Sequence, residues 1–317
     1  MPGNSNDLQA LLTAPETGDM ELVLCSGRVT RRILFHQRRR TGDHPTNPRT
    51  AGAVSYNAGF LKAWPGYGGS RAYGGHMASI AGQHVVVLGG TSGFGFATAK
   101  AAIAESAKVT IASRSAEKVR SALERLGNAA SGECIDVTDK PMLERFFTGL
   151  GPFDHLAVTV GDPLLNKPIM DLTDEEARSA FEVRFCGQFN AVRAAYPHIS
   201  KAGSITLVSG LAGQRASPGR GIYAGVLGGI EGMVKSFAAE LRPVRVNGVC
   251  AGAVDTELWH RLPEAERRET FARIAARLPV GRVGKPEDIA EAYLYLMKTG
   301  FSTGETIVVD GGALQAP

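Results

Sequence analysis

The run Gly89-Gly90-Thr91-Ser92-Gly93-Phe94-Gly95 has the residue types and spacing to bind phosphate groups. It follows the apolar run 85–88 and precedes an alanine-rich helical pattern, so its expected setting is strand, turn and helix. Gly89 permits a tight turn, Gly93 lets the backbone approach a pyrophosphate, and Gly95 lets the helix pack closely on the strand. The free N–H groups at the start of the helix then meet the phosphates. The sequence therefore predicts a dinucleotide site, and a loop that simply needs glycines is the alternative.

Ser113 and Arg114, at the end of the next expected strand, indicate which dinucleotide is bound. An acidic residue at this point would hold the ribose 2′-hydroxyl and favour NAD. Serine cannot repel a 2′-phosphate, and arginine can pair with one. We therefore expect NADP(H) as the cofactor. The alternative is that Arg114 is merely a solvated surface residue.

Alternating apolar runs and helical patterns must position these residues. The pattern predicts an α/β fold, a doubly wound Rossmann-type parallel sheet with helices on both faces. The expected strands are 85–88, 109–112, 133–135, 155–160, 204–208, 244–250 and 306–309. The expected helices are 97–107, 116–126, one from about 139, 173–199 after a cap signal at 173–176, 221–241, 257–277 and 286–298.

The composition is that of an ordinary globular protein, with 44% hydrophobic and 21% charged residues in a chain of 317. No apolar run approaches the ~20 residues that a membrane helix needs, and the N-terminus lacks a secretory pattern. The four cysteines form no CxxC pair, which favours a reducing compartment and argues against a metal site. We therefore expect a cytoplasmic protein that binds a small molecule, with no metal, membrane or nucleic-acid partner.

Residues 1–76 differ from the rest of the chain. They hold 9 basic and 5 acidic residues, which accounts for the whole net charge of +4. Their arginine cluster contains Arg28, Arg31, Arg32, Arg38, Arg39 and Arg40. We expect a disordered or weakly ordered extension, followed by one domain over 77–317. Three interpretations of the cluster are open: the arginines bind nucleic acid or an anionic surface, the segment is an organelle transit peptide, or it is an appended, non-native tail.

Motifs beyond the glycine turn carry a wider pattern. Arg245-Val246-Asn247-Gly248-Val249-Cys250-Ala251-Gly252 is followed by Thr256, and Val309-Asp310-Gly311-Gly312 lies near the end of the chain. With Gly281-Arg282 and Pro286-Glu287-Asp288, these segments resemble the short-chain dehydrogenase/reductase family over about residues 77–317. The resemblance implies a nicotinamide cofactor and a substrate with a carbonyl or alcohol group.

The resemblance also implies which residues surround the cofactor and the substrate. Asp136 and Val137 match the position that holds the adenine, and Thr159 to Gly161 match a motif after the fourth strand. The expected cofactor-binding residues are Gly89, Thr91, Ser92, Gly93, Phe94, Gly95, Ser113, Arg114, Asp136, Val137, Thr159, Gly161, Gly252, Val254 and Thr256. Gly210, Leu258 and Trp259 are expected at the substrate pocket, and ordinary packing is the alternative for the last two.

The catalytic set of the family is incomplete in this sequence. The positions of its Asn, Ser, Tyr and Lys hold Arg184, Gly210, Tyr223 and Leu227. A tyrosine has a pKa near 10 and needs a nearby cation to act as an acid or base at neutral pH. Leu227 cannot supply that charge. We expect Arg184 to polarise Tyr223, the cofactor ribose or an anionic substrate group. We also expect Ser209 to replace the missing serine. The alternatives are that Arg184 makes a structural ion pair and that Tyr223 is simply packed in the core.

Three functions follow from this reading. The leading one is an atypical NADP(H)-dependent oxidoreductase acting on a carbonyl or alcohol. The second is a protein that binds NADP(H) without turnover, as a sensor or scaffold, and the third is a non-redox enzyme such as a cyclase or isomerase. The family often pairs subunits through the helix 221–241, so the resemblance implies a homodimer or homotetramer.

Overall fold

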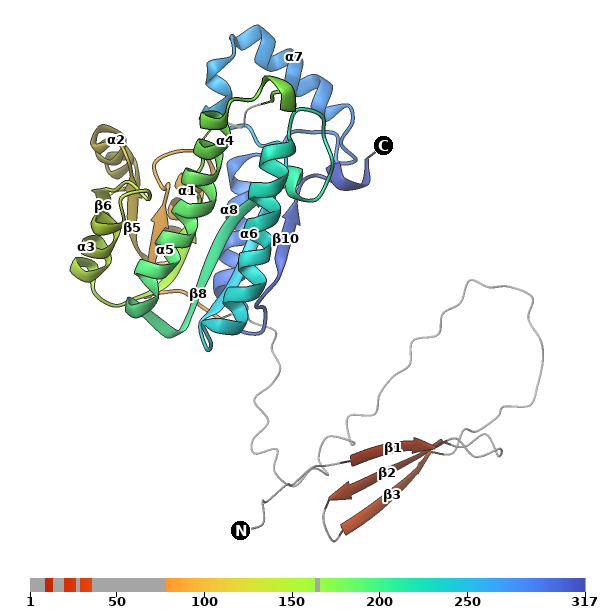
Figure 1. The fold of residues 1–317 in the computed structure, drawn as a ribbon. Helices are drawn as coiled ribbons and strands as arrows, with labels where there is room; N and C mark the ends of the chain where they lie inside the picture. The colour runs from red at the N-terminus through yellow and green to blue at the C-terminus, as the bar shows by residue number, and fades with distance from the viewer. Residues whose placement is uncertain (1–8, 14–19, 27–28, 36–77, 163–165, 317) are drawn as a thin grey trace. The chain divides into compact units, whose positions relative to one another are not determined.

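The computed structural model describes residues 9–13, 20–26, 29–35, 78–162 and 166–316, the first three ranges as backbone only. The chain divides into two compact units, Met1–Ala72 and Tyr73–Pro317. In the smaller unit, β1 (Gln9–Thr13), β2 (Met20–Ser26) and β3 (Val29–Phe35) form an antiparallel sheet in that order (Figure 1). The sequence predicted a disordered or weakly ordered extension here and did not predict these three strands. Of the arginine cluster, only Arg31 and Arg32 lie within the described residues, and the origin of the extension stays a prediction.

The larger unit contains a seven-stranded parallel sheet, which confirms the predicted α/β fold (Figure 1). Its strand order is β10-β9-β8-β7-β4-β5-β6. The strands are β4 (His84–Leu88), β5 (Lys108–Ser113), β6 (Ala130–Cys134), β7 (Phe153–Val158), β8 (Ile199–Gly210), β9 (Arg245–Ala251) and β10 (Thr306–Val309). Sequential strands run outward from β4 in both directions, so the order reverses between β4 and β7. A crevice at the carboxyl ends of these two strands is where such sheets bind ligands.

Helices cover both faces of this sheet (Figure 1). The side chains of Val86 and Leu88 belong to one apolar core, with residues of α3, α5 and α6, whereas Val85 and Val87 belong to a second core with residues of α1, α2 and α8. This division explains why β4 is apolar at every central position. The helices are α1 (Gly93–Ala104), α2 (Ala116–Leu126), α3 (Lys140–Leu150), α4 (Asp174–Phe181), α5 (Gly187–Ala195), α6 (Gly221–Glu240), α7 (Glu264–Ala275) and α8 (Pro286–Lys298).

Two of the long helices predicted from the sequence are interrupted. The expected helix 173–199 consists of α4, a π-helical turn η3 (Glu182–Cys186), α5 and the short 3-10 turn η4 (Tyr196–His198). The expected helix 257–277 is divided into the 3-10 helix η6 (Glu257–Arg261) and α7, because Pro263 cannot continue a helix begun before it. Both interruptions fall on segments that contribute side chains to the site described below.

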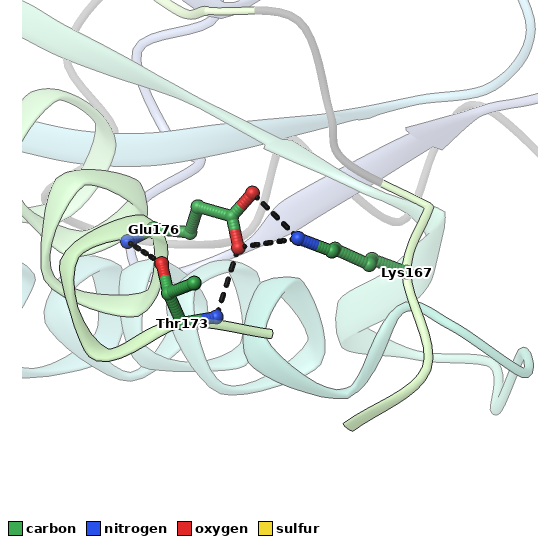
Figure 2. Close-up of polar contacts among 3 residues, drawn as sticks. All are labelled: Lys167, Thr173 and Glu176. Carbon is green, nitrogen blue, oxygen red and sulfur yellow. Dashed lines mark hydrogen bonds and ion pairs between the residues drawn. The ribbon is translucent and has the colours of Figure 1, made fainter. Parts of the chain in front are cut away.

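The start of α4 agrees with its predicted cap signal (Figure 2). The Thr173 hydroxyl accepts a hydrogen bond from the Glu176 N–H at 3.2 Å, and the Thr173 N–H donates to Glu176 Oε2 at 2.9 Å. Lys167 Nζ lies 2.8 and 2.9 Å from the two oxygens of the same carboxylate. These bonds lower the pKa of Glu176, chiefly through Lys167. The pair ties the segment before α4 to the first turn of that helix.

The glycines of α6 allow close packing within the chain. A Cβ on Gly229 would lie 2.9 Å from the Phe185 ring, and one on Gly225 would lie 3.8 Å from Phe181. At Gly229, the backbone of α6 therefore closely approaches η3 of the same chain. Within the described residues, no helix is long and apolar enough to cross a membrane.

Candidate functional site

A cavity of about 710 Å³ opens at the carboxyl ends of the central strands. Every predicted cofactor-binding residue lines it except Asp136, whose carboxylate accepts the N–H and the hydroxyl of Thr138. The three predicted pocket residues, Gly210, Leu258 and Trp259, also line it. The lining from the glycine turn consists of Gly89, Thr91, Ser92, Gly93, Phe94 and Gly95, and the rest of the predicted set there is Ser113, Arg114, Val137, Thr159, Gly161, Gly252, Val254 and Thr256.

The glycine turn is built so that side chains are excluded. Gly89 has φ +89°, and a Cβ there would lie 2.6 Å from Thr159 Oγ1. A Cβ on Gly95 would overlap both the Gly89 carbonyl oxygen and Thr159 Oγ1. Thr159 is held in turn by its hydroxyl, which donates to the Leu88 carbonyl at 2.8 Å. The backbone of the turn is thus open to a ligand on its outer side and closed to any larger residue.

The first N–H of α1 already meets an anionic group. Gly93 has φ +52°, and its N–H donates to Glu257 Oε2 at 2.8 Å. A carboxylate at the positive end of a helix indicates that this position suits negative charge. Because phosphate oxygens make the same hydrogen bonds, the turn fits the pyrophosphate of a dinucleotide. The sequence reading missed Glu257, since only the folded chain brings η6 to the glycine turn.

A second cation stands beside Arg114 at the far end of the cavity. Lys118, in the first turn of α2, lines the cavity together with Ser113 and Arg114. Neither basic side chain has an ion pair within the part of the chain whose side chains are described. The pair fits the 2′-phosphate of NADP(H) better than a free ribose hydroxyl. Lys118 lies four residues after Arg114, a spacing from which the sequence could have suggested it.

Arg184 is buried at the wall of the cavity. Its side chain comes from the π-helical turn η3, and such turns are frequent at functional sites. Its Nε lies 2.9 Å from Asp162 Oδ1, and its Nη2 donates to the Asp162 carbonyl oxygen. The guanidinium also lies over Gly161, where a Cβ would approach Nη1 to 2.8 Å. Burial lowers the pKa of Arg184, and Asp162 and Tyr223 oppose that effect.

Tyr223 lies behind this guanidinium. Its ring centroid is 5.8 Å from Arg184 Cζ, its residue is 1% exposed, and it does not line the cavity. Leu227, one turn further along α6, does line the cavity, as an apolar surface. The structure therefore places Arg184 near Tyr223, with Arg184 on the cavity side. It also shows the ion pair that was the alternative for Arg184.

Ser209 has a partner that the sequence did not indicate. Its hydroxyl lies 2.9 Å from Glu231 Oε1 and 3.3 Å from the Leu227 carbonyl, and Glu231 also accepts from Gln214 Nε2 at 3.0 Å. A serine has one hydrogen to donate, and the Glu231 carboxylate is the nearer and charged acceptor. The Ser209 hydroxyl, at the end of β8, is thus directed at a side chain of α6. This hydrogen bond argues against the predicted role of Ser209 in orienting a substrate carbonyl.

The opposite wall of the cavity comes from η6 and the loop before it. Trp259 Nε1 donates to the Val254 carbonyl at 2.9 Å, and its ring meets Phe271 edge-on at 5.2 Å. Leu258 also lines the cavity and is 46% exposed. Two arginines missed by the sequence reading, Arg220 at the start of α6 and Arg261 at the end of η6, also line this part of the cavity.

Three cysteines with described side chains, Cys134, Cys186 and Cys250, are free thiols. Cys250 is buried at the end of β9, and burial raises the pKa of its thiol to about 12. It is therefore a packed, unreactive group. No group of three or more potential metal ligands occurs among the described residues.

Comparison with known proteins agrees with this geometry. Residues 89–313 match the family model described as enoyl-(acyl carrier protein) reductase. A short-chain dehydrogenase/reductase from Gibberella fujikuroi is 33% identical over 259 residues, which cover 76% of this chain and 98% of that protein. The crystal structure of a small-chain dehydrogenase in complex with NADPH superposes with a TM-score of 0.65 at 33% identity, covering 74% of this chain and 99% of that one. An NADPH-bound short-chain oxidoreductase from Pseudomonas aeruginosa PAO1, which contains an atypical catalytic centre, gives a TM-score of 0.70 at 28% identity, covering 74% and 98%.

Proposed function

The chain belongs to the short-chain dehydrogenase/reductase family, and we propose that it is an atypical NADP(H)-dependent oxidoreductase that interconverts a carbonyl and an alcohol. The observation that carries this proposal is the cavity itself, which joins the glycine turn to a buried arginine. The two NADPH-bound relatives described above support the choice of cofactor.

NADP(H) would be held by backbone at one end and by cations at the other. The N–H groups at the start of α1 would bind the pyrophosphate in place of the Glu257 carboxylate. Arg114 and Lys118 would bind the 2′-phosphate. When bound, the nicotinamide supplies a hydride to the carbonyl carbon or accepts one from the alcohol.

Arg184 would act on the substrate oxygen. Its guanidinium faces the cavity and is fixed by Asp162 and by the π-helical turn. As a carbonyl is reduced, negative charge grows on its oxygen, and a preorganised cation stabilises that charge in the transition state. An arginine remains charged and cannot itself give up the proton. A solvent water in the cavity would then give the oxygen a proton and leave as hydroxide.

Tyr223 would hold the guanidinium in place from behind. This role differs from the one that the family resemblance implies, in which the tyrosine hydroxyl transfers the proton. Direct transfer would require the buried Tyr223 hydroxyl to reach the cavity. Tyr223→Phe separates the two roles, because a positioning ring keeps most of its effect without the hydroxyl whereas a proton donor does not.

Binding of NADP(H) without turnover is the second candidate function. It is favoured by three features of the reaction end: Leu227 at the lysine position, Ser209 bonded to Glu231, and Tyr223 away from the cavity surface. The two candidates make the same prediction for cofactor binding and opposite predictions for turnover.

We also infer that the working protein is a dimer or tetramer and resides in the cytoplasm. Phe181 on α4 and Phe189 on α5 are 36% and 39% exposed. Large apolar side chains on neighbouring helices suit a subunit contact. Sedimentation of the wild-type chain, compared with a Phe181→Ser, Phe189→Ser double variant, tests this inference.

The first experiment follows nicotinamide fluorescence while the full-length protein is titrated with NADPH and NADH. Tighter binding of NADPH is expected, followed by NADPH oxidation with members of a panel of ketones and aldehydes. Binding with no oxidation of any panel member would favour the non-catalytic candidate. Absence of binding to both nucleotides would overturn the proposal.

A further inference from the structure

Arg220 and Arg261 bring two positive charges to the substrate end of the cavity from separate elements. Arg220 precedes the first turn of α6, and Arg261 ends η6. Arg220 is half-buried, and Arg261 is exposed at the rim. Burial lowers the pKa of Arg220, and the like charge of Arg261 lowers it further. Tyr223 opposes these two effects on the Arg220 pKa, and both arginines line the same cavity.

Neither arginine has an ion pair or a side-chain hydrogen bond within residues 78–162 and 166–316. Other arginines in the same region do: Arg184 pairs with Asp162, and Arg215 donates to the Ala313 carbonyl at 2.5 Å. The carboxylates that line the cavity are already bonded, Asp162 to Arg184 and Glu257 to the Gly93 N–H. Among the described residues, the charges of Arg220 and Arg261 thus lack a counter-ion on the cavity wall.

The Glu176 carboxylate, which is paired with Lys167 beside the turn before α6, is also bonded. The Lys167 N–H donates to the Gly219 carbonyl at 3.0 Å, which places the Lys167–Glu176 pair next to the turn that carries Arg220. Figure 2 shows both oxygens of Glu176 directed at Lys167. Gly219 has φ +74°, a conformation that favours glycine. The turn therefore sets the backbone position of Arg220, the next residue.

We propose that Arg220 and Arg261 bind an anionic group, a carboxylate or a phosphate, on the carbonyl substrate. Two guanidinium groups that have no ion pair among the described residues, carried by separate elements at the same part of the cavity, can each donate to a different oxygen of such a group. Because Arg220 is three residues from Tyr223, the anion lies near the Arg184–Tyr223 pair. The substrate class is therefore a short oxo acid or an oxo compound carrying a phosphate ester. This inference rests on the proposed oxidoreductase function for the reaction, and on the cavity alone for the binding.

Matched pairs of compounds test the proposal with the full-length protein. Acetoacetate is compared with its methyl ester, and dihydroxyacetone phosphate with dihydroxyacetone, both as substrates for NADPH oxidation and as ligands in calorimetric titrations. The first pair reports on a carboxylate and the second on a phosphate. We expect the charged member of at least one pair to be preferred by about 100-fold, roughly tenfold for each charge-assisted contact.

The variants are Arg220→Gln, Arg261→Gln and their combination, with Arg268→Gln as the control. Arg268 is an exposed arginine of α7 that does not line the cavity. Each single variant is expected to lose about tenfold of the preference for the charged compound, and the double variant most of it. The uncharged compounds and the NADPH dissociation constant should change by less than about twofold, as they should in the control.

Each outcome bears on one claim. Calorimetric binding of the charged compound that the variants abolish, without NADPH oxidation, would sustain the anion site and favour the non-catalytic candidate function. Equal affinities and equal rates of NADPH oxidation for the charged and uncharged compounds would overturn the anion site and leave the oxidoreductase function intact. Weaker NADPH binding in Arg220→Gln and Arg261→Gln would assign both arginines to the cofactor and overturn the proposal.

Discussion

The cofactor end and the reaction end of the cavity are built by different parts of the chain. At the cofactor end, the site is formed mainly by backbone atoms. The turn around Gly89 and Gly95 excludes side chains, and the Gly93 N–H is directed at an anionic group. At the reaction end, side chains from separate elements meet. Arg184 comes from η3, Asp162 follows β7, and Tyr223 and Leu227 come from α6.

This difference explains why one end follows its family pattern and the other departs from it. A backbone site depends on the absence of side chains, so substitution of a key glycine is excluded by overlap with its neighbours. A side-chain site can be rebuilt one group at a time, provided that each buried charge keeps a partner. The ion pair between Arg184 and Asp162 meets that condition.

The largest effect is expected at the cofactor end. Gly95→Ala places a Cβ against the Gly89 carbonyl and Thr159 Oγ1, neither of which can move without disturbing β4. We expect the free energy of unfolding to fall by about 3 kcal/mol and NADPH binding to weaken more than 100-fold. Chemical denaturation and fluorescence titration measure the two quantities.

Gly149→Ala is the matched control, since a Cβ on Gly149 in α3 meets nothing within 4 Å. It should leave NADPH binding unchanged and stabilise the helix by about 0.5 kcal/mol. If Gly95→Ala bound NADPH as well as this control does, the turn would not be the cofactor site.

The same division separates what the sequence predicts from what it does not. Apolar runs such as 85–88 predict the sheet because burial on both faces demands them. The glycine turn is predictable because its function lies in consecutive residues. The pairing of Arg184 with Asp162, of Ser209 with Glu231 and of Glu257 with the Gly93 N–H joins residues at least 20 positions apart. No local pattern encodes such contacts. The break at Pro263 was visible in the sequence, whereas the π-helical turn was not.

At the reaction end, the second largest effect is expected from Arg184→Met. The variant removes the cation that faces the substrate oxygen, so kcat for NADPH oxidation should fall about 100-fold or more. The dissociation constant of NADPH should change less than kcat does, because Arg184 belongs neither to the glycine turn nor to the Arg114–Lys118 pair that would hold the phosphates. Pre-steady-state measurement of hydride transfer, made below the melting temperature of the variant, separates this loss from lower stability.

Two further variants sharpen that result. Arg184→Lys keeps a charge but not the planar fork that bonds Asp162, so it should recover part of the rate. Tyr223→Phe should lower kcat less than Arg184→Met does. A loss in Tyr223→Phe as large as that in Arg184→Met would mean that the tyrosine hydroxyl transfers the proton and that the reaction end keeps the chemistry of its family.

The side-chain part of the cofactor end should respond more moderately. Arg114→Ala removes one cation from the 2′-phosphate position and leaves Lys118. We expect NADPH to bind about 10-fold more weakly and NADH to bind as before, which one lost charge-assisted contact predicts. Arg120→Ala, an exposed arginine of α2 outside the cavity, is the control. Equal weakening of both nucleotides would contradict the assignment of Arg114 to the 2′-phosphate.

The smallest effect is expected at the contact that joins the two ends. The Glu257 carboxylate occupies the Gly93 N–H, and a pyrophosphate must displace it. Glu257→Ala removes both the competition and a negative charge near the phosphates, so NADPH should bind about threefold more tightly. Glu264→Ala, on the exposed start of α7, is the control. Salt should diminish the gain, because screening weakens the repulsion that the substitution removes. An unchanged affinity would mean that breaking the hydrogen bond between Glu257 and the Gly93 N–H costs no free energy of binding. Weaker binding would mean that Glu257 stabilises the bound cofactor through another contact.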